Sequence, residues 1–362
     1  MDELELKEQE TQSQPVQDTE VPLDKNLRLM SPGMMVVRRF FRSKLSIVGL
    51  VMVIGLFLFS FLGPVLIADT TEGYTDDSKW GETELDRSGK VEYSVNETTF
   101  TVNGVEYTIH QTTEKQVADN FLQSPSANHP LGTDDQGYDV LVRLMYGGRI
   151  SLIVSFLAVF LMTIFGVLMG GLSGFFGGAV DTVIMRICDV LMCLPGIPIL
   201  LIVGTALDNP NWGIDSQYRI YLLMTFLTFI SWPGTARLVR GQILSLREQE
   251  FMVAAEAMGY STGRKIFKHL VPNVMPQLIV QMSLGLGSMI LYEATLSYLN
   301  LGVRAPYAAW GTMINIITTN QDILQNHLYV WVPAGVCIVI AVLGFNFVGD
   351  GLRDALDPKA RR

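Results

Sequence analysis

The most regular feature of the sequence is a series of six long apolar stretches separated by polar segments. A helix needs about 20 apolar residues to cross the hydrocarbon core of a bilayer, so each stretch predicts one membrane-spanning helix. The six ranges are Leu45–Ile67, Ile150–Leu172, Val183–Leu207, Ile220–Ala236, Leu278–Leu299 and Leu328–Val348. A soluble protein with six such stretches would retain little polar surface. We therefore expect an all-α integral membrane fold with six transmembrane helices.

The composition supports this expectation. Hydrophobic residues make up 49% of the chain and charged residues 17%, whereas soluble domains carry about 25% charged residues. The net charge of −9 is unevenly distributed, because eight acidic residues lie within positions 1–24 and fifteen within positions 69–139. The rest of the chain is net basic. The pattern indicates a membrane-embedded body with basic flanks, to which two acidic polar segments are attached.

The region before the first span has two parts. Residues 1–32 are rich in Glu, Gln, Pro and Asp and predict a disordered acidic tail. Residues 33–68 predict a short interfacial helix followed by the first span, because Met34–Lys44 mixes apolar residues with four cations. Basic residues also concentrate in the 237–277 segment and in the tail 351–362. Because Lys and Arg mark cytoplasmic loops, we expect both chain termini to be cytoplasmic.

This topology makes residues 69–139 an extracytoplasmic insert between the first two spans. Within it, Asn103-Gly104 separates the β-rich runs Thr99–Val102 and Val105–Ile109. An Asn-Gly pair between such runs is a strong hairpin signal, since a type I′ turn needs positive φ at both positions. The insert is therefore expected to form a small β-rich lobe. Residues 140–350 then form a core of five spans.

The 248–272 segment predicts a helical hairpin on the cytoplasmic side. Small residues, among them Ala254 and Ala255, occupy a first helix that ends at Gly259. Ser261 is placed to begin a second helix, and Pro272 is expected to end it. Small side chains allow another protein to approach the backbone closely, which favours a docking element. The alternative is an ordinary basic cytoplasmic loop.

Residues that could carry catalysis do not occur in a recognisable pattern. The sequence contains neither a GxxxxGK[ST] phosphate loop nor an HExxH motif, and its four histidines and three cysteines lack metal-ligand spacing. We expect no catalytic residue, no metal site and no cofactor bound by this chain. A membrane enzyme is therefore a poor alternative.

The hairpin resembles a known family element. Ala254-Ala255, Gly259 and Pro272 are similar to the EAA loop of bacterial binding-protein-dependent ABC importers. The resemblance implies that this loop is a coupling helix that docks on an ATPase subunit, with Ala254, Ala255, Glu256, Gly259 and Pro272 as candidate docking residues. The sequence departs from the family at Val253, where Glu is usual, and Glu256 lies at a variable position.

Three further motifs resemble the peptide and nickel branch of these importers, in particular its second permease. They are the run from His129 through Asp135 to Leu152, the run from Gly177 to Gly196, and the run from Glu293 to Gly311. The resemblance implies a bacterial cell-membrane permease that carries oligopeptides or dipeptides, with nickel or another small solute as the alternative cargo. A channel or scaffold without ATP coupling is the alternative from a different class.

The resemblance also implies a set of partners. These are a homologous permease subunit, two ATPase subunits that use ATP and Mg²⁺, an extracytoplasmic substrate-binding protein and the lipid bilayer; nucleic acid is not expected.

Charged residues inside predicted spans are candidate pathway or gate residues, because such charges are costly in a membrane. Arg186 and Asp189 are three residues apart, which allows either mutual neutralisation or a role at an inner gate. Glu293 lies near the end of the fifth span. Lining of a pathway and a structural ion pair are equally plausible for it.

Overall fold

The computed structural model describes residues 32–68, 91–102, 105–116, 122–127, 129–209, 213–214, 216–303 and 307–357. The predicted disordered tail lies almost entirely outside these residues, as does the Asn103-Gly104 turn. Apart from two strands, the described chain consists of helices and connecting loops. Five continuous helical segments are long and apolar enough to cross a membrane, and a bent pair of helices gives a sixth candidate.

The first span is a helical stretch with a change of pitch inside it. It consists of α3 (Lys44–Phe57), the π-helical η1 (Leu58–Leu62) and α4 (Gly63–Ala68), preceded by α2 (Pro32–Phe40). Ser43 caps α3 by accepting a hydrogen bond from the backbone of Ser46. The short helix expected before the first span is thus present.

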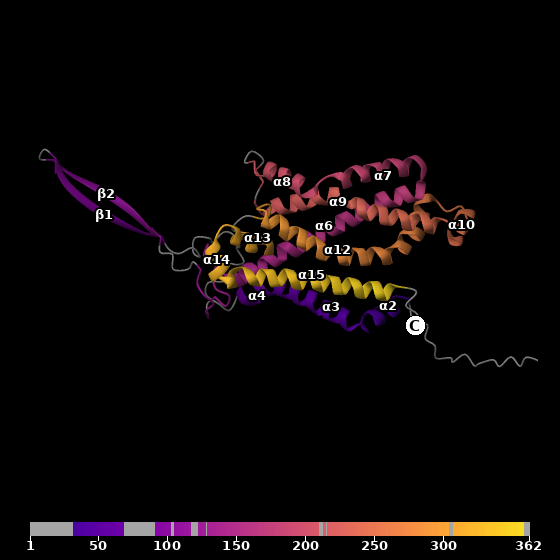
Figure 1. Ribbon diagram of the computed structural model, residues 1–362, viewed down its shortest axis with the longest axis horizontal. Coiled ribbons are helices and arrows are strands. Elements are labelled where there is room, and N and C mark those ends of the chain that lie inside the picture. Colours follow the sequence, from indigo (N-terminus) through magenta and orange to yellow (C-terminus); the bar gives the residue numbers. More distant parts are fainter. Residues whose placement is uncertain are drawn as a thin grey trace, which may run out of the picture.

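Two long helices form the centre of the bundle. These are α6 (Val140–Phe176) and α9 (Ser216–Arg247), which lie side by side (Figure 1). Small residues permit their close approach, since a Cβ added at Gly170 would lie 2.9 Å from Cβ of Val239. The expected spans lie within these helices, but α9 extends to Arg247, eleven residues past the expected end at Ala236.

The predicted third span is wrong in shape. Val183–Leu207 is divided into α7 (Gly178–Cys193) and α8 (Gly196–Leu207), whose axes differ in direction by 79°. The break follows from Pro195, because the proline ring makes helical backbone angles unfavourable for the residue before it. That residue, Leu194, has an extended backbone with ψ of 130°. Pro233, in contrast, lies within the continuous α9.

The predicted stop at Pro272 is also wrong. After α10 (Glu250–Ala257), the chain continues through α11 (Thr262–Arg264), the π-helical η4 (Lys265–Leu270) and α12 (Val271–Tyr298), and residues Thr262–Tyr298 form one continuous helical stretch. Pro272 lies in the first turn of α12, where proline is tolerated because the helix there requires no donor from its nitrogen. The π-helical turn just before it provides the change of register.

The remaining helices close the opposite end of the bundle and return the chain to its starting end. They are α13 (Trp310–Asn315), η5 (Ile316–Thr318), α14 (Gln321–Asn326) and α15 (Leu328–Leu356). In Figure 1, α15 runs beside α3, and the chain ends near α2 at the end of the bundle where α10 lies. The α13–α14 region lies at the other end. α2, α10 and the C-terminal end of α15 therefore share one end, called here the α10 end.

The described part of the insert contains a pair of β-strands. β1 (Val91–Val102) and β2 (Val105–Gln116) pair antiparallel, from Val91 opposite Gln116 to Val102 opposite Val105. They form a two-stranded sheet that extends away from the helices (Figure 1). Two strands alone bury little apolar surface, so the expectation of a folded β-rich lobe is not supported.

Candidate functional site

The hairpin at the α10 end has a defined backbone turn. Gly259 has φ of +69°, and the backbone N–H of Tyr260 donates to the carbonyl of Ala255 over 3.1 Å. This is the glycine-terminated helix end in which a left-handed residue closes the last turn. The predicted role of Gly259 as the end of the first helix is therefore confirmed.

Three side chains stiffen the second half of the hairpin. The guanidinium of Arg264 lies 4.1 Å from the ring centroid of Tyr260. That ring stacks in turn on the imidazole of His269, with 5.6 Å between the centroids. The Lys265 ammonium lies 3.7 Å from the Glu256 carboxylate and ties the second half to α10. The hairpin is thus held by contacts that its own residues supply.

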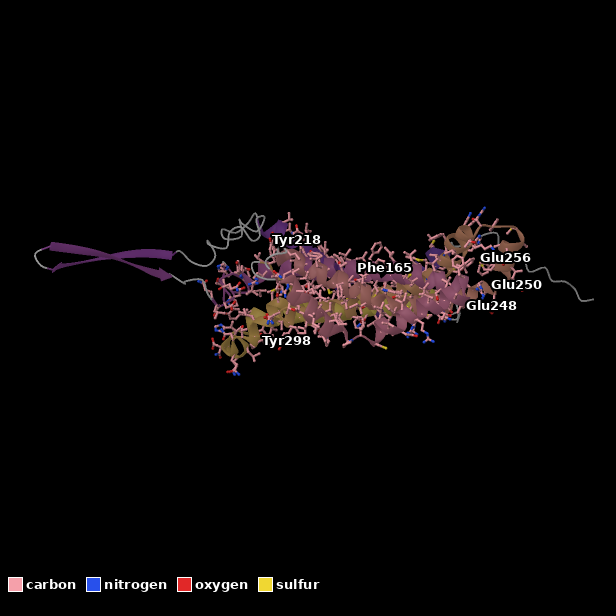
Figure 2. The ribbon with its side chains drawn as sticks, turned by 90° about the horizontal axis from the view of Figure 1, so that it is seen from above. Phe165, Tyr218, Glu248, Glu250, Glu256 and Tyr298 are labelled. Carbon is pink, nitrogen blue, oxygen red and sulfur yellow. The ribbon has the colours of Figure 1, made fainter. Side chains whose placement is uncertain are left out.

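The outer surface of the hairpin carries exposed apolar side chains. Val253, Met258 and Phe267 are 63%, 61% and 66% exposed. Figure 2 shows Glu248, Glu250 and Glu256 at this end of the bundle, while Tyr218 and Tyr298 lie toward the opposite end. Exposed apolar side chains outside the bundle are typical of a surface that another protein covers.

The candidate docking residues do not all lie on this surface. Ala254, Glu256, Gly259 and Pro272 are exposed, whereas Ala255 is buried at 1% exposure. The small side chain of Ala255 therefore serves packing between α10 and the rest of the chain. The sequence analysis did not identify Met258 and Phe267 as candidate docking residues. Both are large and apolar; Met258 precedes Gly259, and Phe267 lies in the second helix.

The two candidate gate residues of α7 are joined to α9. Arg186 lies 3.4 Å from Asp189, and the other carboxylate oxygen of Asp189 accepts from Arg237. The side chains of Arg186 and Asp189 are 79% and 46% exposed within this chain. The predicted pair of Arg186 and Asp189 is present. The second partner of Asp189, Arg237, is 48 residues away in the sequence and could not be assigned from spacing.

A second charged pair joins the same helices. Nε and the terminal nitrogen Nη2 of Arg240 lie 2.5 and 2.6 Å from the two oxygens of Asp181, and Ser173 donates to Asp181 over 2.5 Å. A bidentate arginine–carboxylate contact fixes relative orientation as well as distance. Ser173, Asp181 and Arg240 thus join α6, α7 and α9 near the α10 end.

Glu293 is fully buried near the opposite end. Its two carboxylate oxygens accept hydrogen bonds from Ser151 at 2.8 Å and from Ser297 at 2.7 Å. Ser151 also accepts from the backbone N–H of Trp310 at 3.2 Å. Among the described residues Glu293 contacts no cation, so it takes part in a hydrogen-bonded junction between α6, α12 and α13. Its predicted role in a pathway remains untested.

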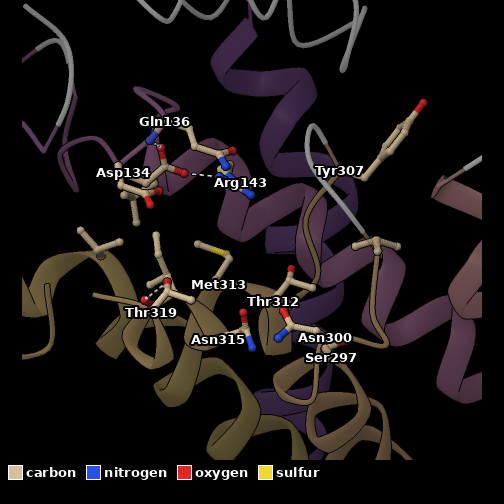
Figure 3. A pocket seen from close by; sticks show the side chains of 15 residues that line it. Asp134, Gln136, Arg143, Ser297, Asn300, Tyr307, Thr312, Met313, Asn315 and Thr319 are labelled. Atoms are coloured by element: carbon tan, nitrogen blue, oxygen red, sulfur yellow. Dashed lines mark hydrogen bonds and ion pairs between the residues drawn. The ribbon is translucent and has the colours of Figure 1, made fainter. Parts of the chain in front are cut away.

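A cavity of about 410 Å³ opens at this end of the bundle. It lies between the loop before α6, the end of α12, α13 and the start of α15, and Figure 3 shows the side chains that line it. On one side the guanidinium of Arg143 is paired with Asp134. The amides of Asn300 and Asn315 line another side. Among the described residues, no group of three or more His, Cys, Asp or Glu side chains could hold a metal ion.

Comparison with known proteins matches two parts of the chain to family descriptions. Residues 162–362 match the binding-protein-dependent transport system inner membrane component. Residues 31–80 match the N-terminal transmembrane domain of oligopeptide transport permease C.

Individual relatives are similar over about two thirds of the chain. A dipeptide transport system permease protein of Alkalihalophilus pseudofirmus is 41% identical over 246 residues, 67% of this chain and 76% of the relative. An oligopeptide transport system permease protein of Bacillus subtilis has the same identity and coverage. A putative peptide permease protein of Brucella suis is 39% identical over 237 residues, 66% of this chain and 75% of the relative. The chain therefore belongs to the family of inner-membrane components of binding-protein-dependent transport systems, as a multi-pass membrane permease.

Proposed function

We propose that this chain is the permease subunit of an ATP-driven importer that carries short peptides. The observation that carries the proposal is the similarity to dipeptide and oligopeptide permeases at 41% identity over 246 residues. The relatives named above are all peptide permeases, which favours peptide over nickel, the cargo that the sequence motifs left open.

The partner of the hairpin in this proposal is an ATPase subunit. Val253, Met258 and Phe267 are exposed apolar side chains of the hairpin, and Glu248, Glu250 and Glu256 lie at the same end of the bundle. A groove with an apolar floor and nearby basic groups would complement these side chains. ATP with Mg²⁺ would be bound and hydrolysed by two such subunits, and the hairpin would transmit their motion to α9 and α12.

A second permease subunit accounts for the charges exposed on α7. Arg186 is 79% exposed in a helix that otherwise presents Val183, Ile187 and Val190 outward. A charge facing lipid is costly. We therefore place this face of α7 against a homologous permease or the water-filled path between the two subunits.

The proposed orientation puts the α10 end in the cytoplasm. The basic residues of α2 and the end of α15 share that end, which agrees with the preference of Lys and Arg for the cytoplasmic side. The cavity and the β-hairpin then face outward, where an extracytoplasmic binding protein would deliver the cargo.

Reconstitution tests the proposal. The chain is purified with its permease partner, its two ATPases and its binding protein, and the complex is placed in liposomes. We expect uptake of radiolabelled trialanine only with ATP and Mg²⁺, and no uptake of ⁶³Ni²⁺. Trialanine uptake without ATP would indicate a channel, and ATP-dependent nickel uptake without peptide uptake would assign the alternative cargo.

A further inference from the structure

The cavity at the outer end contains charged groups that the fold already uses. Oδ1 of Asp134 accepts from the backbone N–H of Gln136 and of Tyr138, each over 2.9 Å, and Oδ2 pairs with Arg143. Asp134 is 3% exposed. Both oxygens of this carboxylate are bound by the chain itself, so Asp134 supports the cavity wall and has little capacity for a ligand.

The neighbouring carboxylate is in a different situation. Asp135 also lines the cavity and is only partly exposed. Among the described residues, nothing forms an ion pair or a side-chain hydrogen bond with it beyond its own backbone amide. Burial, followed by the nearby charge of Asp134, raises the pKa of Asp135 above its ordinary value, and the guanidinium of Arg143 offsets this in part. A partly buried carboxylate without a partner is a good acceptor for a cation that arrives from outside.

Arg143 supports the same wall. Its residue is 8% exposed, its terminal nitrogen is bound to Asp134, and its guanidinium lies 4.9 Å from the ring centroid of Tyr138. Its Nε is buried without a hydrogen-bond partner and is closed off from the cavity. Arg143 therefore holds Asp134 in place and leaves contact with a ligand to the neighbouring groups.

Two amides extend the polar lining. Nδ2 of Asn315 donates to the carbonyl of Tyr298 over 2.5 Å, which holds the side chain in place and leaves its amide oxygen for another donor. Asn300 lies at a left-handed backbone position with φ of 63°, and its carbonyl accepts from Arg219 at 3.0 Å. Both amides are therefore presented by a fixed backbone.

The rest of the lining mixes apolar residues with the polar side chains of Gln136, Ser297, Tyr307, Thr312 and Thr319, and the cavity is of ligand size. The apolar residues are Val140, Val303, Met313, Ile316 and Val330. Small-molecule sites have volumes of about 300–1,000 Å³ and combine apolar walls with a few fixed polar groups. The volume of about 410 Å³ falls in that range.

We propose that this cavity binds the amino-terminal end of a short peptide, with the α-ammonium on Asp135 and the first peptide groups on Asn300 and Asn315. Asp135, which has no ion-pair partner among the described residues, matches one ammonium. Amide side chains match backbone groups without reading sequence, and the apolar part of the wall receives a side chain. The inference rests on the proposed import of peptides and adds to it a subsite on this chain. The free amino terminus becomes the group that is recognised.

Binding by the assembled transporter tests the subsite. The complete permease–ATPase complex is held in lipid nanodiscs without its binding protein, and calorimetry compares trialanine with N-acetyl-trialanine. We expect acetylation to weaken binding about tenfold, in keeping with the loss of one charge-assisted hydrogen bond. Asp135→Asn should weaken trialanine binding to the same extent and leave the acetylated peptide unaffected. Asp135→Glu should restore most of the preference.

Asp322→Asn is the matched control. Asp322 is an acidic residue of α14 at the same end, contacts Asn326 and His327, and does not line the cavity. Its removal should leave both peptides unaffected. Equal binding of the two peptides by the unaltered complex, or an undiminished preference in Asp135→Asn, would overturn the subsite.

The two proposals fail in different ways. If the unaltered complex imports trialanine with ATP but accepts the acetylated peptide equally, the subsite is wrong and peptide import stands. If no peptide is imported under ATP, the proposed function itself is wrong.

Discussion

The hydroxyl of Ser151 donates a hydrogen bond to the buried carboxylate of Glu293, which lies 142 positions later in the chain, over 2.8 Å. The bond joins the first third of α6 to the last third of α12. Ser297 donates to the other carboxylate oxygen at 2.7 Å, and Trp310 donates its backbone N–H to Ser151. The indole N–H of Trp310 in turn reaches the carbonyl of Leu144 at 2.9 Å. These contacts make a polar junction of three helices inside an apolar core.

Replacing Glu293 should therefore destabilise the fold. Glu293→Ala removes the acceptor of two serine hydroxyls and leaves a void, so we expect the free energy of unfolding to fall by about 2–4 kcal/mol. Glu293→Gln keeps the volume and should cost about 1–2 kcal/mol. Thermal unfolding of the purified chain in detergent measures both changes.

Ser288→Ala is the control for this region, because Ser288 is an exposed residue of α12 whose hydroxyl contacts only its own helix. Its melting temperature should not change. Normal unfolding of Glu293→Ala combined with abolished transport would instead assign Glu293 to the pathway.

Gly259 should be sensitive because of its backbone conformation. At φ of +69° a side chain is strained even though open space surrounds the residue. Gly259→Ala should cost about 1–2 kcal/mol locally and reduce co-purification of the ATPase. Gly263→Ala is the matched control, since Gly263 is also in open space but has no positive φ. Equal ATPase recovery from both variants would contradict the role of the hairpin turn in docking.

Gly170 should be sensitive for a steric reason. A Cβ at this position would collide with the carbonyl of Ala236 and lie 2.9 Å from Cβ of Val239. Gly170→Ala should force α6 away from α9 and destabilise the chain by about 1–3 kcal/mol. Gly234→Ala, on α9 but with nothing within 4 Å of the added atom, should be near neutral. The comparison is made by thermal unfolding in detergent, and similar losses in both variants would contradict close α6–α9 packing.

The Asp181–Arg240 pair should show measurable coupling. Its two side chains are 19% and 33% exposed and make two parallel contacts. A double-mutant cycle with Asp181→Asn and Arg240→Gln should give a coupling energy of about 1 kcal/mol. The Arg186–Asp189 pair is much more exposed, and the same cycle there should give less than about 0.5 kcal/mol. A larger coupling energy for Arg186–Asp189 than for Asp181–Arg240 would show that burial does not set the strength of these ion pairs.

Asp135 predicts a pH dependence of stability. Its raised pKa means that the folded state disfavours the ionised carboxylate, so the charge destabilises the fold above that pKa. Asp135→Asn should raise the melting temperature of the ligand-free complex at pH 7. The gain should shrink as the pH falls below the raised pKa and vanish below 3.8, the ordinary value, because the carboxyl is then protonated in both the folded and the unfolded state. A gain that does not vary between pH 7 and pH 4 would contradict burial as the cause.

Much of the architecture follows from local properties of the chain. The length of each apolar stretch predicts a helix that can cross a membrane, and five of the six expected ranges lie within continuous helical segments to within one residue at their ends. Gly259 predicts a helix end because only a residue without Cβ adopts its conformation at little cost. These features depend on residues that are neighbours in sequence, so the sequence alone contains them.

Local signals were misleading where the surrounding structure decides their effect. Three prolines at helical positions carry the same chemical restriction, yet Pro195 breaks its helix while Pro233 lies inside one and Pro272 begins one. A proline leaves a backbone carbonyl of the preceding turn without its hydrogen-bond donor. Whether the helix continues depends on whether the surrounding structure provides another partner for that carbonyl, and the proline alone does not determine this. The β-rich pattern of the insert likewise produced two paired strands without a further layer to cover them.

By itself, the sequence determined that this protein is a helical membrane permease with a hairpin, turned at Gly259, between its fourth and fifth spans. The length of an apolar stretch and the backbone freedom of a glycine are properties of residues that are close together in the sequence. Only the tertiary structure decided which partners the polar groups find. Ser151 meets Glu293, Arg237 meets Asp189, Ala255 turns inward, and Asp135 lies in a cavity wall where no other described residue pairs with it. Such pairings join helices far apart in the chain, and they depend on how those helices pack and rotate against one another.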